Sequence, residues 1–153
     1  MPYETLIGAT TLRTLIESGT APVIVDAGAD LADPGAGERA WAAGHLPGAV
    51  HLHLERDLSG TKTGGNGRHP LPSREAFAAT LGRIGVAPGV QVVVYDGQGS
   101  PYAARVWWML RWMGHAEVAV LDGGRAAWGE AGGPPTTQNP PPATKPPHPQ
   151  RPP

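Results

Sequence analysis

Three short runs of apolar, largely β-branched residues predict the strands of the protein core. They cover residues 22–26 (PVIVD), 91–95 (QVVVY) and 117–121 (EVAVL), with glycine, proline or aspartate close to each end. Their apolar positions are continuous rather than alternating, which is typical of parallel strands buried on both faces. We therefore expect a central parallel sheet.

Two further sets of apolar residues recur at the helical spacing of three and four. They are Leu12, Leu15 and Ile16 in the first set, and Phe77, Leu81 and Ile84 in the second. Ser73 precedes the second set and can cap the start of a helix, and Gly85 can end it. Helices are therefore expected between and around the three strands.

The clearest helical pattern follows Ser100. Pro101 suits the first position of a helix, and Gly114 suits its end. One face of this helix carries Val106, Met109, Leu110 and Met113, and Trp107, Trp108 and Trp112 broaden it. Because this helix lies between two expected strands, residues 91–121 form a β-α-β unit, which needs helices on both faces of a parallel sheet. The predicted fold is three-layer α/β.

Glycine and proline divide the chain into a body and a tail. All 22 glycines lie within residues 1–133, whereas ten of the 18 prolines lie within residues 134–153. Polar segments at 33–38 and 59–72 predict surface loops in the body. The tail shows no apolar periodicity, so we expect it to be extended, partly polyproline II and disordered. We expect one domain over residues 1–133.

Charge and cysteine content exclude several classes of function. The formal net charge is −1, and the body alone has ten basic and 13 acidic residues, so nothing indicates a nucleic-acid or membrane surface. No apolar run is long enough for a membrane span or a secretory signal, which favours a cytoplasmic location. The chain has no cysteine, which excludes disulfides, thiolate metal sites and a sulfur nucleophile within it.

The loop after the strand at 91–95 is the first candidate site, because ligands of α/β sheets bind beyond the carboxyl ends of the strands. It comprises Asp96, Gly97, Gln98, Gly99 and Ser100. Its amides would face an anion, with Asp96 in a structural role as acceptor of loop amides and Ser100 as a helix cap. The chain lacks the third glycine of a dinucleotide fingerprint, the lysine of a phosphate loop and the glycines of a serine-hydrolase elbow.

His51 and His53 are two residues apart on an expected strand after Gly48, so they lie on one face and could begin a metal site. His45 and His69 are close to this pair in the sequence. No acidic or cysteine ligand lies at tight spacing, so histidines beside a crevice are the favoured interpretation. We expect no metal and no cofactor.

Several motifs in order resemble the two-domain rhodaneses, the thiosulfate and 3-mercaptopyruvate sulfurtransferases. They are VDA at 25–27, GHLPGA at 44–49, RHPLP at 68–72, VVYD at 93–96, RVWWML at 105–110 and LDGG at 121–124 with Trp128. The resemblance extends over about residues 6–133 and implies the N-terminal type of the two similar α/β halves. It places Asp96 where the catalytic half carries its cysteine.

The resemblance also implies a role for Glu55 and His69. In the mercaptopyruvate enzymes the N-terminal half lends an acidic residue and a histidine to a site at the seam between halves, and these two residues match those positions. The acidic residue is usually aspartate, so Glu55 departs from the pattern by one methylene. Simple packing of His69 in a glycine-rich loop remains the alternative interpretation.

Without a thiolate the chain alone cannot hold sulfur as a persulfide, so we expect no sulfurtransferase activity from it. The leading hypothesis is a non-catalytic half that completes the site of a cysteine-bearing partner domain, or else self-associates through an apolar seam. A stand-alone ligand-binding or protein-binding module and a truncated remnant stay open. A related phosphatase activity would need a Cys-x₅-Arg loop, which this chain lacks.

Overall fold

A five-stranded parallel sheet forms the centre of the protein, which a computed structural model describes over residues 2–150. The strand order is β1-β5-β4-β2-β3. The strands are β1 (Leu6–Ile7), β2 (Val23–Asp26), β3 (Val50–His51), β4 (Val92–Tyr95) and β5 (Val118–Leu121). The three predicted strands are confirmed as β2, β5 and the central β4, all four of whose residues are buried. The expected strand after Gly48 is β3, but it ends before His53.

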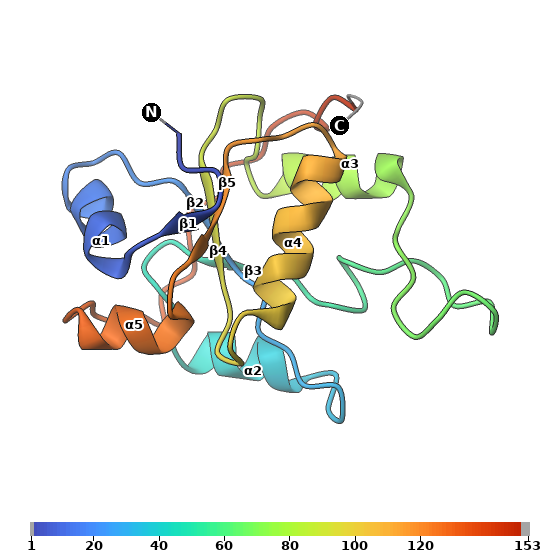
Figure 1. Ribbon diagram of the computed structural model, residues 1–153, viewed down its shortest axis with the longest axis horizontal. Helices are drawn as coiled ribbons and strands as arrows, with labels where there is room; N and C mark the ends of the chain where they lie inside the picture. The colour runs from blue at the N-terminus through green and yellow to red at the C-terminus, as the bar shows by residue number, and fades with distance from the viewer. Residues whose placement is uncertain (1, 151–153) are drawn as a thin grey trace.

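Helices cover both faces of the sheet, which confirms the three-layer α/β architecture (Figure 1). They are α1 (Ala9–Glu17), α2 (Ala36–Ala43), α3 (Arg74–Arg83), α4 (Pro101–Trp112) and α5 (Gly124–Glu130). Leu12 of α1 and Trp128 of α5 pack on one face with Val93, and Phe77 of α3 and Val106 of α4 pack on the other with Val94. Among residues 2–150, no helix is long and apolar enough to cross a membrane.

Local signals in the sequence explain both ends of α3 and the buried face of α4. The Ser73 hydroxyl accepts a hydrogen bond from the Ala76 amide at 3.0 Å, as an N-cap should. Gly85 has φ +91°, in the left-handed region that suits glycine after a helix. The apolar face predicted for α4 is buried, whereas the Trp108 side chain on its flank is 47% exposed.

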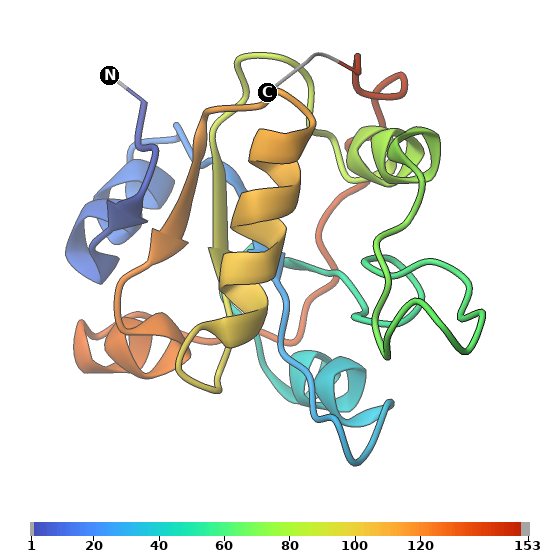
Figure 2. The ribbon, with the colours of Figure 1, turned by 45° about the vertical axis from the view of Figure 1, so that its right-hand side comes forward.

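Helix α2 begins within a segment predicted to be a loop. Residues 33–38 are rich in glycine and proline, but the helix starts at Ala36. Gly37 packs so tightly on the Gly28 backbone that a Cβ atom would collide with the Gly28 carbonyl oxygen. Close backbone packing therefore stabilises this helix, and apolar periodicity does not reveal such packing. In Figure 2, α2 lies beyond the end of the sheet toward which the arrowheads of β4 and β5 point.

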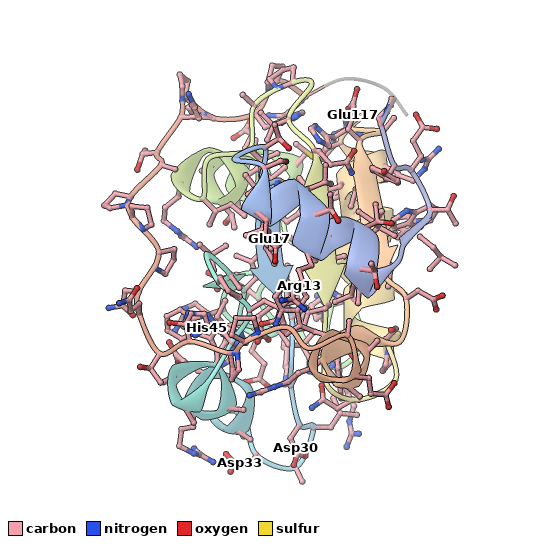
Figure 3. The ribbon with its side chains drawn as sticks, turned by 90° about the vertical axis from the view of Figure 1, so that its left-hand side faces the viewer. Arg13, Glu17, Asp30, Asp33, His45 and Glu117 are labelled. Carbon is pink, nitrogen blue, oxygen red and sulfur yellow. The ribbon has the colours of Figure 1, made fainter. Side chains whose placement is uncertain are left out.

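The proline-rich segment after residue 133 lies against the body instead of extending away from it. His45 and Thr136 exchange backbone hydrogen bonds of 2.9 and 2.8 Å, and a His45 ring nitrogen lies 2.8 Å from the Gln138 carbonyl oxygen. Figure 3 shows the segment running past His45 and on toward α3. It has no regular helix, in keeping with its proline content.

The end of this segment docks on α3. The Lys145 amide donates to the Gly82 carbonyl at 2.7 Å, and a Cβ atom at Gly82 would lie 2.6 Å from the Pro146 carbonyl oxygen. His148 is 3% exposed, and its ring lies 3.0 Å, nitrogen to nitrogen, from the buried His115 ring. The structure therefore differs from the expectation that the tail buries almost nothing, because backbone hydrogen bonds and one histidine hold it.

Candidate functional site

The Asp96 side chain closes the loop between β4 and α4. One carboxylate oxygen accepts the amides of Gln98 at 2.9 Å and Ser100 at 2.8 Å, and the other accepts the amides of Tyr102 and Ala103, both at 3.0 Å. The residue is 1% exposed. The expected structural role of Asp96 is confirmed, since its carboxylate accepts four backbone hydrogen bonds.

This carboxylate occupies the position that a bound anion would take. The amides at the start of α4 and in the loop point at a negative charge, which a helix N-terminus favours, but that charge belongs to the chain itself. The expectation that these amides face an external anion is therefore wrong for the four that Asp96 engages. A persulfide or an oxyanion cannot share those donors while Asp96 is in place.

Ser100 is at the N-cap of α4, but its side chain makes no capping hydrogen bond. Its φ of +80° is the only positive value of a non-glycine residue among residues 2–150. The expectation that the Ser100 hydroxyl caps the helix is wrong, because Asp96 satisfies the first amides instead. The closed loop imposes the left-handed backbone at Ser100, which is costly for a residue with a Cβ atom.

A cavity of about 470 Å³ lies beside this loop, at the carboxyl ends of β2 and β4. Gln98 forms part of its wall, and its side-chain oxygen accepts the amides of Gly97 at 3.3 Å and Ala29 at 3.4 Å. Gln98 therefore joins the loop after β4 to the loop after β2. Arg125, in the first turn of α5, also lines the cavity.

A buried polar cluster lies at the inner end of the cavity. Asp26 accepts the Gly28 amide at 2.8 Å, and the same oxygen lies 3.5 Å from Nδ1 of His51. The Tyr95 hydroxyl accepts the Leu46 amide at 3.2 Å. Burial, followed by the charge of Asp26, raises the pKa of Tyr95, so its hydroxyl stays protonated and neutral at physiological pH. This cluster is therefore a buried wall of the cavity, and neither Asp26 nor the neutral Tyr95 hydroxyl is an activated nucleophile.

Glu55 and His69 lie close together at a second, small hollow of the surface. Oε1 of Glu55 is 3.8 Å from Nε2 of His69, although the residues are 14 positions apart in the sequence. Their side chains are 42% and 20% exposed, respectively, so both reach the surface. The structure thus brings together the two residues that the family resemblance singled out.

A tight turn positions Glu55. Nδ1 of His53 accepts the amides of Glu55 at 3.1 Å and Arg56 at 3.2 Å, and Asp57 accepts the His53 amide at 2.8 Å. Asp57 in turn accepts a hydrogen bond from Arg83 of α3 at 3.0 Å. His53 is therefore a structural residue of this turn.

Arg105 holds His69 in place, and the sequence analysis did not assign it that role. Its Nη2 atom donates to the carbonyl oxygens of Leu58 and His69, both at 2.9 Å. Arg105 therefore holds both ends of the long loop at 58–69 against α4. Burial lowers the pKa of Arg105, and its Nε atom has no hydrogen-bond partner within residues 2–150. An arginine next to the buried Val106 on an apolar helix was the available signal.

The histidines near this edge do not assemble a metal centre. Within the described range 2–150, no group of three histidine, cysteine, aspartate or glutamate side chains could hold a metal ion. The rings of His51 and His53 are 6.4 Å apart, and His45 is 1% exposed and stacked on Trp41. His51 and His45 belong to the packing around the sheet.

Comparison with known proteins agrees with this geometry. The family model described as rhodanese-like domain matches residues 8–131. The chain is 45% identical over 130 residues to SseB of Mycobacterium tuberculosis and 35% identical over 143 residues to the thiosulfate sulfurtransferase of Bos taurus. These matches span 85% and 89% of this chain but only 45% and 46% of the relatives.

Solved structures show the same relation. The 3-mercaptopyruvate sulfurtransferase of Leishmania major superposes on 97% of this chain with a TM-score of 0.80 and 26% identity, and only 41% of that protein is covered. The chain therefore spans about half, or less, of the length of these relatives. By the family model, the sequence identity and the fold together, this chain belongs to the rhodanese-like domain family.

Proposed function

We propose that the chain is a non-catalytic rhodanese-like half that completes the active site of a cysteine-bearing partner domain. The observation that carries this proposal is the closed loop at Asp96. Sulfur transfer in this family needs a thiolate that takes the sulfane sulfur and holds it as a persulfide. A carboxylate that already accepts four backbone amides can neither form a persulfide nor free the loop for one.

Glu55 and His69 are the residues that we propose to serve the shared site. An imidazole can pass a proton to or from a substrate, and the Glu55 carboxylate oxygen, 3.8 Å from Nε2 of His69, is close enough to pair with it. Both side chains reach the surface, where a partner domain can approach them. His53 and Asp57 fix the turn that carries Glu55. The Glu55 side chain is one methylene longer than the usual aspartate, which lets its carboxylate approach His69 from this turn.

Relatives that are about twice as long support a partner of similar size. The proposed partner is a cysteine-bearing catalytic half, and self-association is the alternative arrangement. The names of the relatives suggest thiosulfate or 3-mercaptopyruvate as the sulfur donor of the completed enzyme.

A reconstitution assay tests the proposal. The purified chain is mixed with a separately produced cysteine-bearing rhodanese half, and thiocyanate formed from cyanide is measured with each donor. We expect no thiocyanate from the chain alone, and a rate with the partner that rises to saturation as the chain is added. Thiocyanate formed in proportion to the concentration of the chain alone would refute the non-catalytic assignment.

Variants test the shared site within the same assay. Glu55→Gln and His69→Asn should lower kcat of the mixture about 100-fold, the usual range for a lost general acid or base, while leaving partner binding unchanged. Arg39→Gln is the matched control, because Arg39 pairs with Asp33 on the exposed surface of α2. Equal rates for all three variants would show that Glu55 and His69 only pack the loop.

The natural partner can be sought directly. The tagged chain is purified gently from its own cells, and mass spectrometry identifies what accompanies it. We expect a cysteine-bearing rhodanese half. Recovery of the folded chain without such a half would favour the second candidate, a stand-alone binding module, which the cavity beside the Asp96 loop supports.

A further inference from the structure

The cavity beside the Asp96 loop has the size and position of a small-molecule site. Its volume of about 470 Å³ lies within the range of about 300–1,000 Å³ that is usual for ligand pockets. The loop after β2, helix α2, the loop after β4 and the start of α5 all contribute to its wall. Figure 3 shows Asp30 and Asp33 on the loop after β2, at the end of the molecule where this cavity lies.

Arg125 is the positively charged residue in the wall of this cavity. Within residues 2–150 its guanidinium makes no hydrogen bond or ion pair. Its Nη2 atom lies 3.2 Å from the place that a Cβ atom would take at Gly44, and its charge acts on the Tyr95 hydroxyl. Four other arginines each have a carboxylate partner: Arg13, Arg39, Arg56 and Arg83.

The carboxylates of the cavity do not take the place of a ligand. Asp26 is 4% exposed and is engaged by the Gly28 amide and approached by His51. Asp30 is exposed and accepts the Ala32 amide at 2.8 Å in its own turn. A half-buried guanidinium in a concave site, left unpaired by these groups, is suited to a planar oxyanion that accepts two hydrogen bonds.

The rest of the wall supplies apolar contact. Leu31 lines the cavity and is 62% exposed, and Ala36, Ala40 and Tyr102 line it as well. An inorganic anion gains nothing from these side chains, whereas a short hydrocarbon group removes their surface from water. We propose that this cavity binds a small organic carboxylate, with its carboxylate on Arg125 and its hydrocarbon part against Leu31 and Tyr102.

This site is distinct from the Glu55 and His69 pair. Residues 28–31 line both the cavity and the small hollow at that pair, so one loop separates the two. Binding at Arg125 needs no cysteine and no partner domain. The proposal therefore stands or fails independently of the proposed function.

A titration followed by amide NMR tests the site in the intact chain. Butyrate is the probe, butyramide is its neutral isostere, and sulfate is an inorganic oxyanion. We expect saturable shifts of the Ala29, Gly97 and Gln98 amides with butyrate, none with butyramide, and markedly weaker binding of sulfate. Absence of saturation with butyrate, or equal binding of butyramide, overturns the proposal, and equal binding of sulfate overturns its organic part.

Variants assign the effect to the guanidinium. Arg125→Gln should weaken butyrate binding about tenfold or more, because a charge-assisted pair of hydrogen bonds is lost. Arg39→Gln, which alters the exposed pair with Asp33, should leave the affinity unchanged. Unchanged binding in Arg125→Gln would also overturn the proposal, and the butyrate-butyramide comparison in the unaltered chain does not depend on how either variant folds.

Discussion

Asp96→Asn should destabilise the protein strongly although it changes almost no volume. The asparagine oxygen can accept two of the four amides, but its NH₂ group is a donor and would face the other two. Two backbone amides near the buried start of α4 then lose their partners, and each loss of a hydrogen bond to a charged group costs about 1.5–3 kcal/mol. Because the exposed part of the loop admits some water, we expect a total loss of about 3–5 kcal/mol in the free energy of unfolding.

Urea unfolding followed by circular dichroism measures this loss. With an m-value of about 2 kcal/mol/M for a domain of this size, the urea midpoint should fall by about 2 M. Asp30→Asn is the control, since among residues 2–150 the exposed Asp30 carboxylate accepts only the Ala32 amide, and it should cost less than about 1 kcal/mol. A loss below about 1 kcal/mol for Asp96→Asn would refute the reasoning, because the four contacts would then contribute little to stability.

The same geometry predicts the behaviour of a thiol placed at this position. In Asp96→Cys, removal of the carboxylate frees the four amides, and these amides and the start of α4 should stabilise the thiolate, so the thiol pKa should lie below its ordinary value of about 8.5. The rate of alkylation by iodoacetamide as a function of pH reports this pKa without interference, because the chain has no other cysteine. Thr61→Cys, in the exposed long loop, should titrate normally; matching curves for the two variants would contradict the prediction.

Two more substitutions test contacts that hold the surface loops. Arg105→Lys should lose one of the two hydrogen bonds to the Leu58 and His69 carbonyls, lower the free energy of unfolding by about 1–3 kcal/mol and speed amide hydrogen exchange at 59–69. Exchange as slow as in the unaltered chain would argue against a role of Arg105 in holding this loop. Gly82→Ala places a Cβ atom 2.6 Å from the backbone of the tail, so the Lys145 amide should exchange faster. Gly129→Ala, with open space around it, should leave that amide slow. Similar exchange rates in both variants would show that the docking of the tail does not depend on Gly82.

The elements that the sequence predicted are those whose stability comes from apolar burial. The strands β2, β4 and β5 and the helices α1, α3 and α4 carry runs or faces of large apolar residues, which hydrophobic periodicity detects. Strand β1 has only two residues, too few for any period to be visible. Strand β3 was expected after Gly48, but with two residues it is shorter than predicted and ends before His53. Helix α5 is seven residues long and buries one large side chain, Trp128, so its pattern is equally weak.

Other features rest on the backbone and could not be predicted from side-chain patterns. The packing of Gly37 on Gly28 and the docking of the tail on Gly82 both depend on a missing Cβ atom and on carbonyl positions far away in the chain. Arg105 acts on His69 through backbone oxygens 36 residues away. Sequence patterns identified the loop at Asp96, its acceptor role and the edge of the sheet at which the cavity lies, but they did not reveal Arg125, whose guanidinium has no partner within residues 2–150.

Asp96 decides which chemistry is left to this edge of the sheet. Its carboxylate accepts the amides of Gln98, Ser100, Tyr102 and Ala103, so these four donors are closed to an anion. A side chain that makes no hydrogen bond or ion pair within residues 2–150 can instead meet a ligand, and Arg125 is one that lies in a cavity of suitable size. Asp96 thus has a structural role at this edge. Of the two sites that we propose beside it, the one at Arg125 would act within this chain alone, and the Glu55 and His69 pair would need a second domain.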